Sequence, residues 1–471
     1  MLTKSGFLDF LSCKKSFGLA LHNPALLGRQ SLSAFDRMLA ADGRAVEQLA
    51  VEHFRQQPEA DRYRFQMVFE VDDLHARADV VLHHDDGSID LFEIKSSTSV
   101  KSSGRDHRID ACFQMIVAER AGFAVRRAHL VLLNSGYVRR GEIDTDALLD
   151  VLDVTVEARE MEAGVAAQID EAMAIRNGPP PVQDFCDCLF LGSTQRRCAG
   201  FAWLNPDLPH PSAHLLPRIS AKRLKLLHQD GRLAMKDVVP ADLTPSQLPT
   251  WKAFCNGHPV IDRPAISRFL KELEEPLSFY DYETFGSAIP LCDDFSPHKQ
   301  IPVQFSLHTQ AHDELIHHEF LSQAPGRHAD LVRSLKNVIP PAGSLLVWNA
   351  AFEKACNLRL ADLVPNESDF LEDLNERTVD LMLPFRDAYV DARFEGSASI
   401  KRVLPVLVPE LSYDEARVHD GAGAMEAWLE MVNTCDNLKR DDLRQQLLRY
   451  CELDTLAMVK IYQFLVDLLS E

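Results

Sequence analysis

Two pairs of residues near the C-terminus could carry out hydrolysis with the help of metal ions. Asp281 and Glu283 are separated by one residue in the apolar stretch LSFYDYE, so on a strand both carboxylates leave the same face. Tyr450 and Asp454 are four residues apart in a long helical stretch, so they also share a face. Carboxylates that converge in this way can hold two divalent ions, roughly 4 Å apart, that clamp the attacking and leaving oxygens of a phosphodiester. Hard oxygen ligands favour Mg²⁺ or Mn²⁺ over zinc.

A further acid, Glu353, lies between these pairs in the stretch VWNAAFEKA, where a strand ending at Asn349 is expected to lead into a helix. The order D-x-E, N-x-x-F-acid and Y-x3-D resembles the DEDD exonucleases of the RNase H-like fold, in their tyrosine-bearing subgroup. The resemblance covers residues 276–471. It implies a metal-dependent enzyme that hydrolyses a nucleic-acid strand in the 3′→5′ direction.

The resemblance gives each matching residue a role. It implies that the metal-binding acids are Asp281, Glu283 and Asp454, that Tyr450 orients the attacking water, and that Glu353 is the remaining acid of the centre. The family usually has an aspartate where Glu353 stands. Either this longer side chain reaches the metal from a shifted helix, or Asp380 assists it. The alternative is a decayed nuclease fold that keeps the acids as a structural remnant.

A second group of polar residues lies in the stretch 76–97, which is typical of a β-hairpin because two apolar runs flank an Asp-Asp-Gly turn. Glu93 and Lys95 share one face of the second strand, and antiparallel pairing can bring Asp79 beside them. The two acids could chelate a metal, while the lysine positions a water or offsets charge on a phosphate. The bland interpretation of the E-x-K triplet is a surface ion pair.

This pattern resembles the PD-(D/E)xK nucleases. Gln114, in the helix expected over residues 108–122, matches the glutamine that RecB-like members carry after the core strand. Glu47, in an early helix, is a weaker candidate for their additional acidic motif. The resemblance therefore implies a second nuclease centre at the N-terminus.

One early and three late cysteines flank this N-terminal region: Cys13, Cys186, Cys188 and Cys198. RecB-like nucleases with an iron–sulfur cluster have one early and three late cysteines, so the resemblance implies a structural [4Fe–4S] cluster. Zinc also accepts four cysteines, and ordinary thiols are the third alternative. The remaining six cysteines lie in apolar patterns that predict core thiols.

The elements that position these residues fall into three regions, which together predict an α/β multidomain protein. Residues 1–205 are expected to form a restriction-endonuclease-like domain of the PD-(D/E)xK type with the four cysteines. Residues 206–272 predict a basic segment of short helices joined by proline turns. Residues 273–471 alternate strands and helices, which favours an RNase H-like (DnaQ-like) mixed sheet with flanking helices.

The 471-residue chain has 50 lysines and arginines against 70 acids, so its net charge of −20 argues against loose, charge-driven coating of nucleic acid. Basic residues gather between Arg196 and Arg232. The candidate nucleic-acid contacts in this segment are Arg218, Lys222, Arg223 and Lys225, with a solvated helix face as the alternative. Lys401 and the adjacent Arg402 could contact a phosphate or cap a helix in solvent.

A composition of 46% apolar and 25% charged residues is typical of a folded globular protein and excludes disorder as the main state. No apolar run approaches the roughly 18 residues of a membrane span, and the opening stretch lacks a signal-peptide core. We therefore expect a cytoplasmic protein without membrane contact.

The two resemblances together are similar to a family of bacterial proteins of largely undefined role. They predict a metal-dependent nuclease with two centres, acting on DNA or RNA with a free end, preferably single-stranded, with a helicase or other processing protein as partner. Repair, processing and defence all suit such an enzyme. Two alternatives stay open: only the C-terminal centre is active, or the chain is a non-catalytic subunit that binds nucleic acid or protein.

Overall fold

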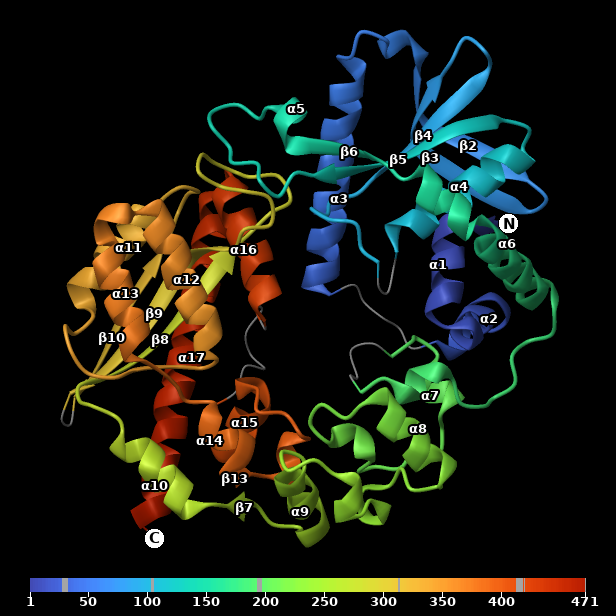
Figure 1. Cartoon of the computed structure of the whole chain (residues 1–471). Helices are drawn as coiled ribbons and strands as arrows, with labels where there is room; N and C mark the ends of the chain where they lie inside the picture. The colour runs from blue at the N-terminus through green and yellow to red at the C-terminus, as the bar shows by residue number, and fades with distance from the viewer. Residues whose placement is uncertain are drawn as a thin grey trace. The chain divides into compact units, whose positions relative to one another are not determined.

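The computed structural model describes residues 1–27, 33–102, 106–192, 197–311, 314–411, 418 and 420–470. The chain divides into two compact units (Figure 1). Unit 1 is Met1–Asp207 with Ser287–Lys299, and unit 2 is Leu208–Gly286 with Gln300–Glu471. Most of the middle segment that the sequence suggests as a separate region, residues 208–272, thus belongs to unit 2.

Unit 1 is built around a mixed sheet. Its strands are β1 (Leu2–Thr3), β2 (Tyr63–Val71), β3 (Leu74–His83), β4 (Ser88–Ile94), β5 (Ala124–Leu133) and β6 (Leu149–Asp153). Its α-helices are α1 (Lys4–Ser12), α2 (Lys14–His22), α3 (Ala34–Arg55), α4 (His107–Arg120), α5 (Thr145–Leu148), α6 (Thr155–Asn177) and α7 (Phe201–Leu204). The sheet order is β1–β3–β4–β5–β6, and β2 also pairs with β3.

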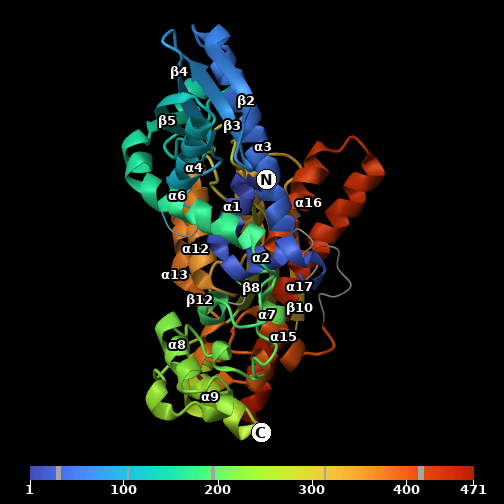
Figure 2. The same ribbon diagram turned by 90° about the vertical axis from the view of Figure 1, so that its right-hand side faces the viewer.

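The predicted hairpin is confirmed as the antiparallel pair β3–β4. Its turn uses Gly87 at φ +82°, a conformation that glycine adopts without steric cost. Helices α1, α4 and α6 cover one face of the sheet, and α3 packs on the other (Figure 2). Ala78 of β3 packs in the core under α1, α4 and α6, whereas Val80 packs in the core under α3. Because alternate residues of a regular strand point to the same face, β3 is locally irregular at Asp79, between them.

Unit 2 contains a second mixed sheet and more helices. Its strands are β7 (Val260–Ile261), β8 (Leu277–Phe285), β9 (Ile301–Ala311), β10 (Glu314–Leu321), β11 (Leu345–Val347), β12 (Thr378–Asp380) and β13 (Tyr389–Val390). Its α-helices are α8 (Ala221–Gln229), α9 (Leu248–Asn256), α10 (Arg263–Lys271), α11 (His328–Val338), α12 (Ala350–Leu363), α13 (Ser368–Arg377), α14 (Leu383–Asp387), α15 (Ile400–Leu407), α16 (Gly421–Asn433) and α17 (Asn437–Ser470).

The main sheet of unit 2 has the order β10–β9–β8–β11–β12, antiparallel on one side of β8 and parallel on the other. Helices α11 and α12 pack on one face, and α17 crosses the other face over β8, β9 and β10 (Figure 1). The sequence of α17 contains no glycine or proline, and Asp436 accepts a hydrogen bond from the backbone N–H of Leu438 at its start. This long helix carries Tyr450 and Asp454 to the sheet.

The expected mixed α/β multidomain character is confirmed in the described residues. Short local patterns explain the agreement, since β8, the β3–β4 hairpin and α17 each show their own hydrophobic period. Among the helices that the structure describes, none is both long enough and apolar enough to cross a membrane.

Candidate functional site

Three carboxylates of unit 2 converge where β8 faces α17. Asp281 and Glu283 come from β8, and Asp454 comes from α17. One oxygen of each carboxylate lies within 4.8 Å of the other two. Cys451, one turn before Asp454, places its Sγ 3.8 Å from Asp281 Oδ2. The structure thus brings together the acids of both pairs that the sequence singles out.

Burial and mutual repulsion define the electrostatics of these acids. Burial raises the pKa of Asp281 and of Glu283 well above the ordinary carboxyl value, and the charge of Asp454 raises both further. Lys401 acts on the pKa of Glu283 in the opposite direction. Divalent cations relieve such repulsion, and a set of carboxylate oxygens suits Mg²⁺ or Mn²⁺.

Glu353 lies in the first turn of α12, beside this group but outside it. Its side chain is 1% exposed, and its Oε2 has no hydrogen-bond partner among the described residues. Burial raises the pKa of Glu353 to about 8, and Asp380 also raises it. The charge of Glu353 in turn raises the pKa of Asp281 and Glu283. Glu353 is therefore electrostatically part of the centre.

Asp380, which the sequence suggests as a possible assisting acid, holds the backbone next to Glu353. Its Oδ1 accepts hydrogen bonds from the backbone N–H of Asn349 at 3.1 Å and of Met382 at 3.0 Å. Asn349 has a φ of +81° and immediately precedes α12. Asp380 thus holds the turn from which α12 and Glu353 start.

Tyr450 and Lys401 complete the surroundings of the acids. Tyr450 is buried one turn before Asp454, and Lys401 Nζ lies 5.9 Å from the centre of the Tyr450 ring. Arg402, next to Lys401, instead pairs with Glu395 at 2.9 Å. Of the two adjacent cations, Lys401 is the one directed at the acids.

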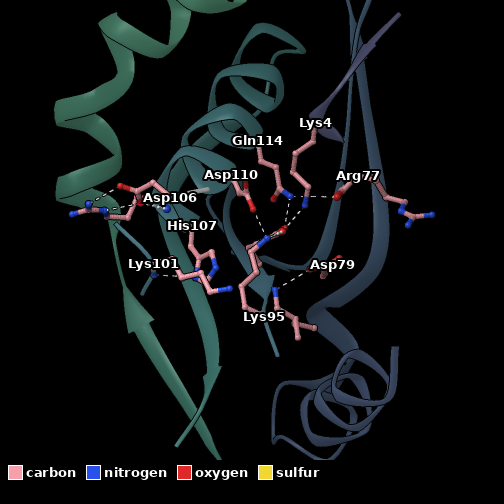
Figure 3. Close-up of polar contacts among 12 residues, drawn as sticks. Lys4, Arg77, Asp79, Lys95, Lys101, Asp106, His107, Asp110 and Gln114 are labelled. Carbon is pink, nitrogen blue, oxygen red and sulfur yellow. Dashed lines mark hydrogen bonds and ion pairs between the residues drawn. The ribbon is translucent and has the colours of Figure 1, made fainter. Parts of the chain in front are cut away.

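The hairpin of unit 1 carries the second group, with Glu93 at its centre. Glu93 Oε1 accepts hydrogen bonds from the ammonium groups of Lys4 and Lys95, the latter at 2.7 Å, and its Oε2 accepts from Gln114 Nε2 at 2.5 Å. Lys95 also pairs with Asp110. Figure 3 shows Lys4, Asp110 and Gln114 pointing to the same place as the end of the Lys95 side chain, where the Glu93 carboxylate accepts from Lys4, Lys95 and Gln114. The E-x-K triplet is thus a buried network, and the alternative of a surface ion pair is wrong, since Glu93 is 3% exposed.

The charges of this network are balanced. Burial alone would raise the pKa of Glu93, but Lys95 and Lys4 hold it at about 2. Burial would lower the pKa of Lys95, but Glu93 and Asp110 raise it. Glu93 is therefore a carboxylate whose two oxygens are both occupied by donors of the protein.

Asp79 lies beside this network at the irregular point of β3. Its Oδ2 accepts from the backbone N–H of Ile94 at 2.9 Å, and Gln66 Nε2 lies 3.4 Å from its Oδ1. Gln66, at φ +53°, also donates to Glu47 at 2.5 Å. Burial and the charge of Glu93 raise the pKa of Asp79 to about 7. The weaker candidate Glu47 is thus linked to Asp79 through Gln66.

Sequence reasoning missed two members of the hairpin network. Asp110 precedes Gln114 by four residues on α4, so helical spacing could have identified it. Lys4 lies 89 residues from Glu93 in sequence, and no local spacing signals their contact.

The four cysteines that the sequence groups together do meet in unit 1. One ligand atom of each lies within 4.8 Å of the others, and Cys186 Sγ lies 3.8 Å from Cys198 Sγ. Cys13 also caps α2, since its Sγ accepts from the backbone N–H of Ser16 at 3.4 Å. Hydrogen bonds among the four thiols lower the pKa of Cys186 and lower that of Cys188 to about 7, and they raise the pKa of Cys13 and Cys198. Four thiols this close together could hold a metal ion or an iron–sulfur cluster as thiolates.

The remaining cysteines divide into two classes. Cys112, Cys356 and Cys451 are buried, as predicted. The prediction is wrong for Cys255 and Cys435, which are exposed, and for Cys292, which is half-buried. Short apolar stretches around these residues form helices and turns near the surface, where an apolar neighbour in sequence does not imply burial.

The basic residues between Arg196 and Arg232 are divided between the two units. Arg196 lies outside the described residues, Arg197 belongs to unit 1, and the remainder belong to unit 2. Arg223 and Arg232 both pair with Asp242, at 3.2 and 2.5 Å.

The other candidates in the basic run are exposed. Lys222 and Lys225 are exposed on α8. Arg218, also exposed, lines an open groove of about 530 Å³ in unit 2 with Arg386 and Ser397.

Comparisons with known proteins find one family and several relatives that are similar to parts of this chain. The family described as "Domain of unknown function (DUF2779)" matches residues 278–399. An uncharacterized protein of Mycoplasma pneumoniae, the MG366 homolog, is 26% identical over 223 residues, which is 42% of this chain and 33% of that protein. The Mycoplasma genitalium protein MG366, also uncharacterized, is 25% identical over 224 residues, with the same shares of the two chains. The chain thus spans about a third of the length of these relatives.

A distant structural neighbour is the protein of the crystal structure of SSO0001. It is 13% identical, and the match covers 38% of this chain and 78% of the neighbour with a TM-score of 0.24.

Proposed function

We propose that unit 2 is a metal-dependent nuclease that hydrolyses phosphodiester bonds from a free 3′ end. The observation that supports this is the convergence of Asp281, Glu283 and Asp454 within 4.8 Å, next to Tyr450 and Lys401. This arrangement, on a mixed sheet crossed by a long C-terminal helix, is what a DEDD-type RNase H-like domain requires.

In this proposal each side chain has a defined task. Asp281, Glu283 and Asp454 hold Mg²⁺ or Mn²⁺, which supplies charge neutralisation and Lewis acidity at the phosphodiester. Tyr450 orients the attacking water through its hydroxyl group. Lys401 donates to the scissile phosphate and offsets the charge that develops on it. The substrate is a DNA or RNA strand with a free end.

We propose a second nuclease centre in unit 1, formed by Asp79, Glu93, Lys95 and Gln114 as in PD-(D/E)xK enzymes. Asp79, with a pKa of about 7, and Glu93 would be the metal-binding acids, and Lys95 would face the phosphate. Metal binding there has to displace a donor from Glu93, because Lys4 and Lys95 both contact its Oε1. That contact also supports the alternative in which unit 1 binds nucleic acid without cutting it.

The cysteine cluster is proposed as a structural centre of unit 1. The resemblance to RecB-like nucleases implies [4Fe–4S], whereas the 3.8 Å between Cys186 Sγ and Cys198 Sγ equals the spacing in a tetrahedral zinc site with Zn–S bonds of about 2.3 Å. Visible absorption of protein purified without oxygen separates the two, because zinc absorbs no visible light.

The test is a cleavage time course on 5′-labelled single-stranded DNA and RNA with Mn²⁺ or EDTA. Wild type is compared with Asp281→Asn and Lys95→Ala, and with the exposed controls Asp441→Asn and Lys101→Ala. A ladder of shortened products that depends on Mn²⁺ and disappears only in Asp281→Asn assigns exonuclease activity to unit 2. Products lost in Lys95→Ala assign a second activity to unit 1.

Two outcomes contradict the proposal. If wild type gives no Mn²⁺-dependent product but shifts the same strands on a gel, the chain is a non-catalytic binding subunit. If Asp281→Asn retains as much activity as its control Asp441→Asn, the acids of unit 2 are not the catalytic centre.

A further inference from the structure

A second polar cluster in unit 2 lies one strand away from the acids, on the same face of the sheet. His308 of β9 and His317 of β10 are directly paired, and their rings stack with 4.4 Å between centres. Glu452 and Thr455 of α17 lie against them, one turn apart. A nitrogen of each ring and an oxygen of Glu452 all lie within 4.8 Å of one another.

Hydrogen bonds use one nitrogen of each ring. Thr455 Oγ1 lies 3.0 Å from the carbonyl oxygen of Glu452, to which it can donate. The same hydroxyl lies 2.8 Å from His308 Nδ1 and 2.7 Å from Ser306 Oγ. Ser306 Oγ lies 2.9 Å from His317 Nε2.

The nitrogens that make these hydrogen bonds are His308 Nδ1 and His317 Nε2, so the nitrogens left for a metal are His308 Nε2 and His317 Nδ1. The latter lies 3.8 Å from Glu452 Oε1. One nitrogen of each imidazole and the Glu452 carboxylate thus lie close together, an arrangement that a cation between them would stabilise.

We propose that His308, His317 and Glu452 form a binding site for a divalent transition metal, with zinc as the expected ion. Two histidines and one carboxylate, with a position left for water, form a recognised zinc ligand set. Metal-bound histidines characteristically donate their other N–H to an oxygen, and each ring here has a hydroxyl oxygen within hydrogen-bond distance of its other nitrogen. This site is distinct from the nuclease centre and does not depend on the proposed activity.

Binding requires the three ligand atoms, which lie within 4.8 Å of one another, to move closer together. Zinc bonds of about 2.0–2.1 Å place tetrahedral N and O ligands roughly 3.3–3.4 Å apart. His317 Nδ1 and Glu452 therefore have to approach by about half an ångström. The Glu452 side chain is 45% exposed and His317 24%, so both are accessible from solvent. A bound ion would fasten the β9–β10 hairpin to α17, the helix that carries Asp454.

The experiment is Zn²⁺ titration by calorimetry on full-length protein, with any affinity tag removed, the cysteine cluster loaded as purified and excess Mg²⁺ present. His317→Ala and His308→Ala are each expected to bind one equivalent of Zn²⁺ fewer than wild type. The matched control is His318→Ala, the next residue of β10, whose side chain points to the opposite face of the sheet. Thr455→Val is expected to weaken the binding of this Zn²⁺ equivalent about 10- to 100-fold, because it removes the hydroxyl group that orients His308.

Asp281→Asn separates this site from the acid cluster and is expected to retain the equivalent. The proposal is overturned if His317→Ala binds Zn²⁺ with the stoichiometry and affinity of wild type, or if His318→Ala loses the same equivalent. Should His308→Ala fail to fold, the partly exposed His317 decides the question alone.

Discussion

Glu353 combines nearly complete burial with a carboxyl oxygen that lacks a hydrogen-bond partner among the described residues. Burial raises its pKa from 4.5 to about 8. An acid whose pKa is higher in the folded state contributes stability that is fully present below the unfolded pKa and is lost as pH rises through the folded pKa. Glu353 is therefore expected to make the metal-free protein progressively less stable as the pH rises from 4.5 to about 8.

Glu353→Gln removes this titration. We expect the free energy of unfolding in EDTA to become less dependent on pH in that window, by up to about 1.4 kcal/mol per pH unit. Denaturant unfolding at several pH values measures it, with the exposed Glu372→Gln on α13 as control. A slope equal to that of wild type would show that Glu353 already ionises with its ordinary pKa.

Lys401 and Arg402 offer a matched pair of cations for testing phosphate contact. Lys401 is directed at Tyr450 and the acids, while Arg402 is paired with Glu395. If Lys401 donates to the phosphate, Lys401→Ala lowers kcat/KM for Mn²⁺-dependent cleavage about 10- to 100-fold. Arg402→Ala removes only an exposed ion pair, so its kcat/KM stays within about threefold of wild type. Equal losses in both variants would point to general attraction of the nucleic acid instead.

At the scale of residues, sequence spacing predicted which acids lie together but not their full surroundings. Asp281 and Glu283 share a strand face, and Tyr450 and Asp454 share a helix face, so two local periods are enough to form pairs. Lys4 contacts Glu93 across 89 residues, and only the folded chain brings such partners together.

At the scale of elements, Cys13 joins the helices α1 and α2 to the chain around Cys186 and Cys198. Its Sγ also caps α2, a role that a serine hydroxyl performs equally well. Cys13→Ser therefore keeps the cap and removes one metal ligand.

If the cluster holds a metal, Cys13→Ser lowers the stability of unit 1 by about 2 kcal/mol or more, which is a fall in Tm of at least about 4 °C. Metal analysis and thermal unfolding together measure the effect, and the exposed Cys435→Ser serves as control. Unchanged metal content and Tm in Cys13→Ser would show that the four cysteines are ordinary thiols that bind no metal.

The helices and strands were easier to predict from the sequence than the contacts between them. The β3–β4 hairpin, β8 and α17 follow from a turn signal, a buried run and a helical period in single stretches of sequence. The irregularity of β3 at Asp79 has no such local signal, because it depends on how β2 pairs with β3 near Gln66. The metal-ligand pair His308 and His317 was missed for the same reason, since its register is a property of two strands.

At the scale of the whole molecule, the chain has a net charge of −20, and three of its acids lie together in unit 2. Asp281, Glu283 and Asp454 repel one another in a buried place, which costs stability when no cation is bound. The division of the chain into two units could not be read from sequence in full, because residues 287–299 belong to unit 1 although they interrupt unit 2. Ala288 and Ile289 pack in the core of unit 1, which explains this assignment.

Metal binding to the acids is expected to appear as a change in the thermal unfolding of the full chain. Mn²⁺ at 100 times its Kd stabilises the folded state by about 2.7 kcal/mol, which raises Tm by roughly 5–10 °C for a unit of this size. Asp281→Asn removes one repelling charge and one ligand. Its Tm in EDTA should therefore rise by about 2–4 °C above that of wild type, while the shift caused by Mn²⁺ is largely lost.

Calorimetry of the same variants in EDTA and in Mn²⁺ tests both halves of this expectation. Asp441 is an exposed acid of α17, the helix that carries Asp454, so Asp441→Asn should behave as wild type. Cys13→Ser should keep the rise in Tm caused by Mn²⁺, because Cys13 belongs to the cysteine cluster of unit 1. A Tm of Asp281→Asn below that of wild type in EDTA would mean that the carboxylate stabilises the fold, as in a structural remnant. The opposite pattern is that Asp281→Asn is more stable than wild type in EDTA and is not stabilised by Mn²⁺. This pattern is typical of a binding site whose residues destabilise the fold when the ligand is absent.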